Sequence, residues 1–157
     1  MKKLIPKAQT LTNIMLAVFR LNRRLLDSGD NLVKTLGINS ARWQLLGAVS
    51  LAGRPLSAPQ IADTMGVTRQ GAQKQLNKMV AEGYFETQPN PRHERSPVYA
   101  LTRMGQRTFV GAMAREEKWT TDLATTLSND DLMRTLNILT QLQQQLESSD
   151  PLKEAKS

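Results

Sequence analysis

The sequence predicts a mainly α-helical fold that carries one small β-hairpin. Three observations lead to this prediction. Leucine-rich stripes with helical spacing occur near both ends of the 157-residue chain. Between them, two short helical segments meet at a glycine. Two β-prone runs then follow, with a proline-rich stretch between them. A chain of this length has room for one ordinary domain, so we expect a single domain over residues 1–157.

The first expected helix has the strongest periodicity. Its apolar residues recur three and four positions apart, which places them on one face of a helix. These residues are Leu11, Ile14, Val18, Leu21 and Leu25. Because serine and glycine are common where helices end, Ser28 and Gly29 predict a helix over residues 8–28.

The second expected helix begins at Ser40, which can cap it, and ends before Gly53 and Pro55. The third begins at Ser57 and ends at Gly66, and it carries a proline in its first turn. Its expected core residues are Ile61, Ala62 and Met65.

The fourth expected helix runs from Thr68 to Gly83 and has an apolar face. This face consists of Ala72, Leu76, Met79 and Val80. Two β-prone runs follow, at residues 84–88 and 98–101, with a polar loop over 89–97. Two helices joined at a glycine, followed by such a hairpin, predict a winged helix-turn-helix core over residues 38–102.

The C-terminal part predicts two more helices. Thr102 caps a long helix that extends to about Leu127, and Ser128 begins the last one. The last helix carries a leucine stripe at Leu132, Leu136, Leu139, Leu142 and Leu146. We expect the helices over 8–28 and 103–148 to flank the core and to dimerise, because their stripes need a partner surface. The alternative is that the stripes pack against each other within one chain.

The fourth helix also has a polar face. Arginine and glutamine can read base edges in the major groove, whereas lysine and threonine suit phosphates. We therefore predict that this face binds DNA, with its N-terminal end nearest to the bases. The predicted residues are Thr68, Arg69, Gln70, Gln73, Lys74 and Asn77. The alternative is that the face is merely solvated, as most polar helix faces are.

The hairpin loop carries two arginines, Arg92 and Arg95. An arginine on a protruding tip can enter the minor groove, where narrow A·T-rich DNA concentrates negative potential. We predict this role for both residues. Alternatively they only make the loop soluble, and Arg95 pairs with Glu94 or braces the wing.

The charge distribution favours a nucleic-acid partner. The net charge is +7 and the isoelectric point about 10.1. Residues 1–50 carry +6, residues 51–110 carry +4 and residues 111–157 carry −3. Cationic side chains release counterions from phosphates, so the first two parts are the ones expected near DNA. A membrane surface or an acidic protein would attract the same charge.

The composition argues against an enzyme. The chain has no cysteine and one histidine, His93, so it offers no thiolate metal site and no Ser-His-Asp or Cys-His set. Asp130 and Asp131 fit a helix start. We predict no catalytic residue, no metal and no cofactor. The sequence has no apolar run of transmembrane length and no signal-peptide core, so we expect a soluble, cytoplasmic protein without a membrane partner.

Residues 61–105 resemble the core of the MarR family of winged helix-turn-helix transcriptional regulators. The resemblance rests on residues 61–70, on the helix end at 79–85 and on the wing at 90–96. The wing leads into Leu101, Thr102 and Gly105, which match the family's strand-to-helix junction.

In the wing, this sequence matches the family pattern at two positions and departs from it at two others. Arg92 and Arg95 match the two arginines. Asn90 and His93 stand where acidic residues are frequent, which puts a carboxylate brace behind the wing arginine in doubt. Asn90 can still accept a hydrogen bond.

The resemblance implies a homodimer that binds a pseudo-palindromic site in double-stranded DNA, commonly as a repressor. It also implies release by a small aromatic or anionic effector in a cleft between the dimerisation helices and the winged core. The candidate ligand-binding residues are Arg20, Asn22, Arg42 and Trp43. The alternative places Trp43 in the core and both arginines on the surface. A winged-helix module that binds protein instead of DNA is the competing function.

Overall fold

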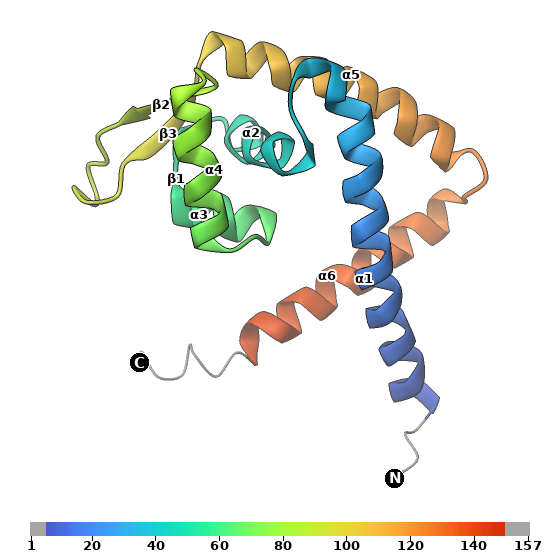
Figure 1. The fold of residues 1–157 in the computed structure, drawn as a ribbon. Helices are drawn as coiled ribbons and strands as arrows, with labels where there is room; N and C mark the ends of the chain where they lie inside the picture. The colour runs from blue at the N-terminus through green and yellow to red at the C-terminus, as the bar shows by residue number, and fades with distance from the viewer. Residues whose placement is uncertain (1–5, 150–157) are drawn as a thin grey trace. The chain divides into compact units, whose positions relative to one another are not determined.

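The computed structural model describes residues 6–149, and this part of the chain divides into two compact units between Glu116 and Glu117. The fold is mainly helical with a small three-stranded antiparallel sheet, which confirms the predicted fold class. The elements are α1 (Pro6–Val33), a 3-10 turn (Lys34–Leu36), α2 (Ser40–Ala52), β1 (Leu56–Ser57), α3 (Ala58–Met65), α4 (Arg69–Ala81), β2 (Phe85–Gln88), β3 (Val98–Leu101), α5 (Arg103–Ala124) and α6 (Asn129–Ser148) (Figure 1).

The helix-turn-helix is held by two side-chain caps that the sequence predicted. The hydroxyl of Ser57 accepts from the backbone N–H of Gln60, and the Gln60 side chain accepts from the Ser57 N–H at 2.9 Å. Gly66 ends α3 with φ at 64°, in the left-handed region that glycine adopts without a Cβ clash. Thr68 then caps α4 by accepting from Gly71 N–H at 3.1 Å.

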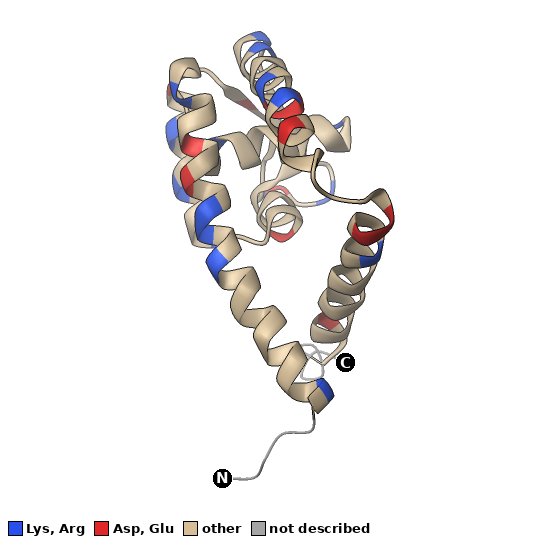
Figure 2. Ribbon diagram, turned by 90° about the vertical axis from the view of Figure 1, so that its right-hand side faces the viewer, with Lys and Arg blue, Asp and Glu red and all other residues tan. Residues whose placement is uncertain are grey.

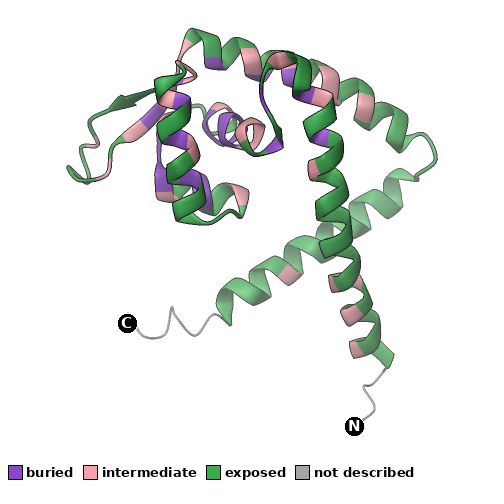
Figure 3. Ribbon diagram, in the orientation of Figure 1, coloured by how far each residue is buried: buried purple, intermediate pink, exposed green. Residues whose placement is uncertain are grey.

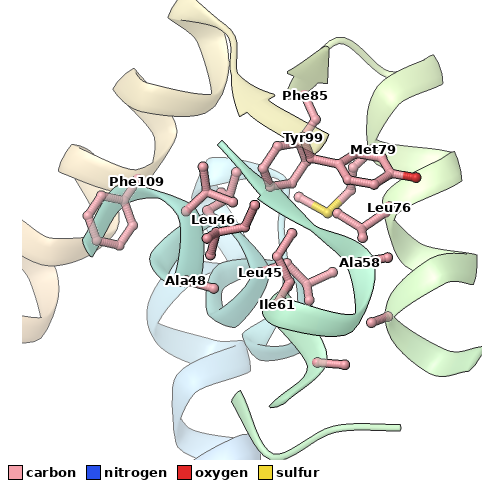
Figure 4. Close-up of a cluster of buried hydrophobic side chains, with 14 of the residues drawn as sticks. Leu45, Leu46, Ala48, Ala58, Ile61, Leu76, Met79, Phe85, Tyr99 and Phe109 are labelled. Carbon is pink, nitrogen blue, oxygen red and sulfur yellow. The ribbon is translucent and has the colours of Figure 1, made fainter. Parts of the chain in front are cut away.

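One hydrophobic core joins α2, α3, α4 and the sheet (Figure 4). Its largest fully buried side chains are Phe85, Leu46, Ile61, Leu76, Met79 and Val33. Burying such a side chain stabilises a fold by about 1.5–3 kcal/mol. The core therefore fixes α4 with its apolar face inward, which decides which residues of α4 face solvent.

The sheet has the order β1-β3-β2, so β3 is its central strand. Tyr99 of β3 pairs with Leu56 of β1 and with Thr87 of β2. The predicted hairpin is confirmed for residues 85–88 and 98–101, and Tyr84 lies one position before β2. Strand β1 was not predicted, because two residues are too few to show a period of two.

The predicted end of the first helix was wrong, because α1 continues to Val33. Gly29 does not stop this helix. It is buried, and a Cβ at this position would overlap the hydroxyl oxygen of Ser40. That hydroxyl donates to the carbonyl oxygen of Leu26 at 2.7 Å. Gly29 is therefore a close-packing position between α1 and α2.

The predicted cap of the second helix was also displaced by one residue. Asn39 is the cap, since its side chain accepts from the Arg42 N–H at 3.0 Å. Ser40 is the first helical residue, and its own N–H donates to the Asp30 carboxylate at 2.7 Å. The serine hydroxyl is committed to α1, so it cannot cap α2.

The last two helices begin where the sequence placed them. The Thr102 hydroxyl accepts from the Gly105 N–H at 3.1 Å, and α5 ends at Ala124, three residues before the expected end. Ser128 caps α6 by accepting from the Asp131 N–H at 3.1 Å. No residue of α6 is buried, and its leucine stripe is largely exposed (Figure 3). Within residues 6–149, no helix combines the length and the apolarity needed to span a membrane.

Candidate nucleic-acid interface

Helix α4 presents the predicted polar face to solvent. Ala72, Leu76 and Met79 are buried on its inner side. The capping residue and the five polar residues on the other side are all exposed; they are Thr68, Arg69, Gln70, Gln73, Lys74 and Asn77. The structure therefore brings all six predicted residues of this helix together on one accessible surface.

The N-terminal end of this surface is tightly built. A Cβ at Gly71 would lie 2.9 Å from the Thr68 hydroxyl oxygen, so the glycine leaves room for the cap. Arg69 lies 3.9 Å from the carboxylate of Asp63, and both side chains are more than 70% exposed. Such an exposed ion pair contributes little to stability. The Arg69 guanidinium can therefore exchange Asp63 for another hydrogen-bond acceptor at little cost.

The middle of the surface contains a hydrogen-bonded network. The amide nitrogen of Gln73 donates to the side-chain oxygen of Asn77 at 2.9 Å and to the hydroxyl of Tyr99 at 2.8 Å. Asn77 lies one helical turn further along α4, whereas Tyr99 lies on β3 and is buried. The sheet that carries the wing thus holds a side chain of the exposed helix face.

The wing loop is braced by Asn90. Its side-chain oxygen accepts from the backbone N–H of Arg92 at 3.1 Å, and its amide nitrogen donates to the carbonyl oxygen of Ser96 at 2.9 Å. The expectation that Asn90 accepts a hydrogen bond is confirmed, and the donor is a backbone group of the wing. Arg92 and Arg95 are both exposed on this loop, at the tip of the hairpin and apart from the α4 surface in sequence.

A hollow of about 900 Å³ lies between the wing and the start of α3. Arg54, Arg92 and His93 are among its lining residues, and none of those residues is acidic. Arg54 was not a predicted site residue. In the sequence Arg54 is marked only by its position between Gly53 and Pro55, which indicates a turn. The pairing of β1 with β3 then places this turn beside the wing.

Arg42, a candidate ligand-binding residue, forms a bidentate ion pair with Glu82. One guanidinium nitrogen donates to a carboxylate oxygen at 2.9 Å, and the second donates to the other oxygen. This pair ties the start of α2 to the residue that ends α4. The hydrogen bond from Arg42 lowers the pKa of Glu82, and the same bond raises the pKa of Arg42.

The Arg42–Glu82 pair makes a pH-dependent prediction for stability. A carboxylate with a lowered pKa in the folded state stabilises the fold above its ordinary value of 4.5, and this contribution is lost as the pH falls through the lowered pKa. Glu82→Gln is therefore expected to reduce the free energy of unfolding at pH 7, with a smaller deficit near pH 3. Urea denaturation at both pH values measures this. An equal deficit at both values would contradict the ionic role.

The other three ligand candidates lie at different places. Arg20 lines a shallow hollow of about 560 Å³ on α1, together with Arg23 and Arg24. Asn22 is exposed on the same helix, and Trp43 is half-buried against the core. Figure 2 shows basic and acidic positions close together along α1. Among the described residues, no group of three or more His, Asp or Glu side chains is arranged to hold a metal ion.

Comparison with known proteins agrees with the winged-helix fold described above. A sequence profile described as "MarR family" matches residues 36–96. An uncharacterized protein from Mycobacterium tuberculosis is 40% identical over 99 residues, which covers 63% of this chain and 68% of that protein. The aligned length exceeds the profile match, so the likeness extends beyond the winged core.

Solved structures share the fold. MarR from Staphylococcus aureus, in complex with salicylate and kanamycin, is similar with a TM-score of 0.74 and 17% identity over 92% of this chain and 97% of that one. The transcriptional regulator MosR from M. tuberculosis, in complex with DNA, is similar with a TM-score of 0.68 and 18% identity over 83% and 95%. Members of the matching family are transcription regulators and not enzymes. The chain is a winged-helix transcription regulator of the MarR family.

Proposed function

We propose that this regulator binds a specific pseudo-palindromic DNA sequence as a homodimer and represses transcription there. The observation that carries the proposal is the exposed polar face of α4, with six side chains suited to bases and phosphates on a helix whose other face is fixed in the core. If this face were merely solvated, it would not need these six side chains beside a wing that carries two arginines and is braced by Asn90.

The proposed partner of the helices outside the core is a second copy of the chain. A single recognition helix reads too few base pairs for useful specificity, whereas two related by a twofold axis read two half-sites about one DNA turn apart. The exposed leucine stripe of α6 and the apolar residues exposed on α1 offer the surface that such a dimer needs. A helix with no buried residue gains most from an intermolecular partner.

In the proposed complex, each part of the core (residues 38–102) has its own task. The first turns of α4 enter the major groove, where Arg69, Gln70 and Gln73 meet base edges. Thr68 and Lys74 bind phosphates, and Asn77 acts with Gln73. Arg92 and Arg95 lie at the adjacent minor groove, and Arg54 lines the same acid-free hollow as Arg92.

Selection of bound sequences from random duplex DNA tests the proposed function. The full-length protein is incubated with the duplex pool and nonspecific competitor at a stated salt concentration, because nonspecific binding depends steeply on salt. The expected result is an enriched inverted repeat. A folded dimer that enriches no sequence would contradict the proposal and would favour a winged-helix module that binds protein.

The wing arginine provides a separate prediction. Arg92→Ala is expected to weaken binding to the selected site by about 5- to 100-fold, the range that one or two lost charged contacts give. The dimer should persist, because Arg92 lies on an exposed loop. Arg134→Ala is the matched control, since it removes an exposed charge from α6. Equal affinities of wild type and Arg92→Ala at moderate salt would remove Arg92 from the interface.

The proposed mode of control is a non-covalent effector. The chain has no cysteine, so it has no thiol through which an oxidant could act. The named Staphylococcus structure holds salicylate, and we propose a small aromatic or anionic effector for this cytoplasmic regulator as well. Arg20, with the hollow on α1, is the candidate most open to it, together with Asn22. Arg42 and Trp43 would have to leave the Glu82 pair and the core, respectively. Titration of salicylate into the protein–DNA complex tests release.

A further inference from the structure

The Tyr99 hydroxyl lies next to a proposed base-reading residue although Tyr99 itself is buried. Tyr99 is 3% exposed, and it pairs with a strand on each side within the sheet. The ring packs edge to face on Phe85, with ring centroids 6.3 Å apart and an interplanar angle of 84°. Figure 4 shows this ring in the core cluster with its oxygen toward α4. The Tyr99 hydroxyl is therefore held in place by the core, whereas Gln73, which donates to it, is exposed.

The amide nitrogen of Gln73 is fully used. A glutamine amide has two N–H donors and one carbonyl acceptor. One donor is bound by Tyr99 at 2.8 Å and the other by Asn77 at 2.9 Å. Among the hydrogen bonds of residues 6–149, none uses the Gln73 side-chain oxygen, so this oxygen is what Gln73 offers to a ligand.

We propose that Tyr99 is a positioning residue that makes Gln73 an acceptor-only reader of DNA. A free glutamine reads adenine with two bonds, accepting from N6 and donating to N7. With both N–H groups held, Gln73 can only accept. In the major groove only adenine N6 and cytosine N4 donate, whereas guanine and thymine present acceptors. Gln73 then selects an amino base, adenine or cytosine, and rejects the two keto bases. This inference rests on the proposed function.

Asn77 completes the same surface. Its oxygen accepts from Gln73, which leaves its amide nitrogen as a donor one helical turn away. The pair thus presents one acceptor and one donor in a fixed order along α4. Because the order is set by a buried tyrosine of the sheet, the base preference depends on the wing strand as well as on the recognition helix.

The test compares the wild type with Tyr99→Phe on duplexes that differ at one base pair. The selected site supplies the sequence, and the position is the one at which Gln73→Ala abolishes the preference. We expect the wild type to favour adenine or cytosine there. Immobilising a free side chain on binding lowers affinity by about 2- to 12-fold. Tyr99→Phe is expected to weaken binding to the favoured base by this factor and to leave guanine and thymine no worse, since a freed N–H can now donate to them.

Two further variants keep the test decisive. Tyr84→Phe is the matched control: it removes the hydroxyl of the other of the two tyrosines in the sequence and is expected to leave the base preference unchanged. Asn77→Ala frees the second Gln73 N–H at an exposed position, and it is expected to admit the keto bases in the same way. If thermal unfolding shows that Tyr99→Phe is not folded, Asn77→Ala decides the question.

The outcomes separate this inference from the proposed function. A uniform loss over all four base pairs, or an unchanged preference, would overturn the positioning role of Tyr99. A wild-type preference for guanine or thymine at this position would overturn the acceptor-only reading, with specific DNA binding intact. No enriched sequence with the wild-type protein would overturn the proposed function and the inference together.

Discussion

Leu136→Asp is expected to convert the protein into a monomer and to weaken binding to the full DNA site by about 10²- to 10⁴-fold. Leu136 is 60% exposed on α6, so the substitution removes little packing within one chain. A carboxylate in an apolar interface between two copies would be desolvated without a partner. Loss of the dimer makes the two half-site contacts independent, and the stated factor is the usual gain from linking two binding events.

Leu51→Asp is the matched control for this experiment. Leu51 is 76% exposed, but it lies on α2 in the winged core. Light scattering should therefore find a dimer for Leu51→Asp and a monomer for Leu136→Asp. Circular dichroism of both variants checks that the helices persist. A dimer of Leu136→Asp with undiminished binding would show that the α6 stripe is not the contact between copies.

Gly105→Ala is expected to lower the free energy of unfolding by about 1–3 kcal/mol, the usual cost of overpacking. A Cβ at Gly105 would overlap the backbone carbonyl oxygen of Tyr84 and would lie 3.2 Å from a methyl carbon of Leu101. The same carbonyl oxygen accepts from the Thr102 N–H at 3.1 Å, while the Thr102 hydroxyl donates to the neighbouring carbonyl oxygen of Gly83 at 2.5 Å. An added Cβ at Gly105 would therefore overlap backbone atoms, which cannot move aside as easily as the end of a flexible side chain.

Gly111→Ala, in the same helix, tests whether the effect comes from this contact. A Cβ at Gly111 would meet only side-chain atoms, of which the nearest is a methyl carbon of Leu36 at 3.4 Å. Alanine is favoured over glycine inside a helix by about 1 kcal/mol. Gly111→Ala is thus expected to be neutral or stabilising in urea denaturation. An equal loss of unfolding free energy from both substitutions would mean that the contact with the Tyr84 carbonyl is not the cause of the Gly105→Ala effect.

The Gly105 contact gives a physical reason for the spacing Leu101-Thr102-x-x-Gly105. Thr102 binds the turn before β2 through its hydroxyl and caps α5, since the Gly105 N–H donates to that hydroxyl at 3.1 Å. The glycine must then pass against the Tyr84 carbonyl. The pattern was read from the sequence as a strand-to-helix junction, but its close packing against the turn after α4 is visible only in three dimensions.

Local chemistry explains what the sequence predicted correctly. The serine, threonine and glycine signals at Ser57, Gly66, Thr68 and Ser128 act through bonds or backbone angles within a few residues, so a local pattern is sufficient to find them. The polar face of α4 was also predictable, since the apolar positions Ala72, Leu76 and Met79 fix which side is buried.

Contacts between distant segments account for what the sequence did not predict. Gly29 reads locally as a helix end, yet α1 continues through it, and its missing Cβ leaves room for the Ser40 hydroxyl of α2. Arg42 was a candidate ligand-binding residue, yet it forms an ion pair with Glu82, which is 40 residues away.

The sequence by itself thus determined where the helices lie, apart from the end of α1 and the cap of α2, and it determined the hairpin and the face of α4 that meets solvent. Only the tertiary structure decided that a tyrosine of the sheet holds Gln73. The reason is physical: caps and stripes depend on neighbours in the chain, whereas the hydroxyl of Tyr99 reaches a residue 26 positions away because β3 and α4 pack on one core.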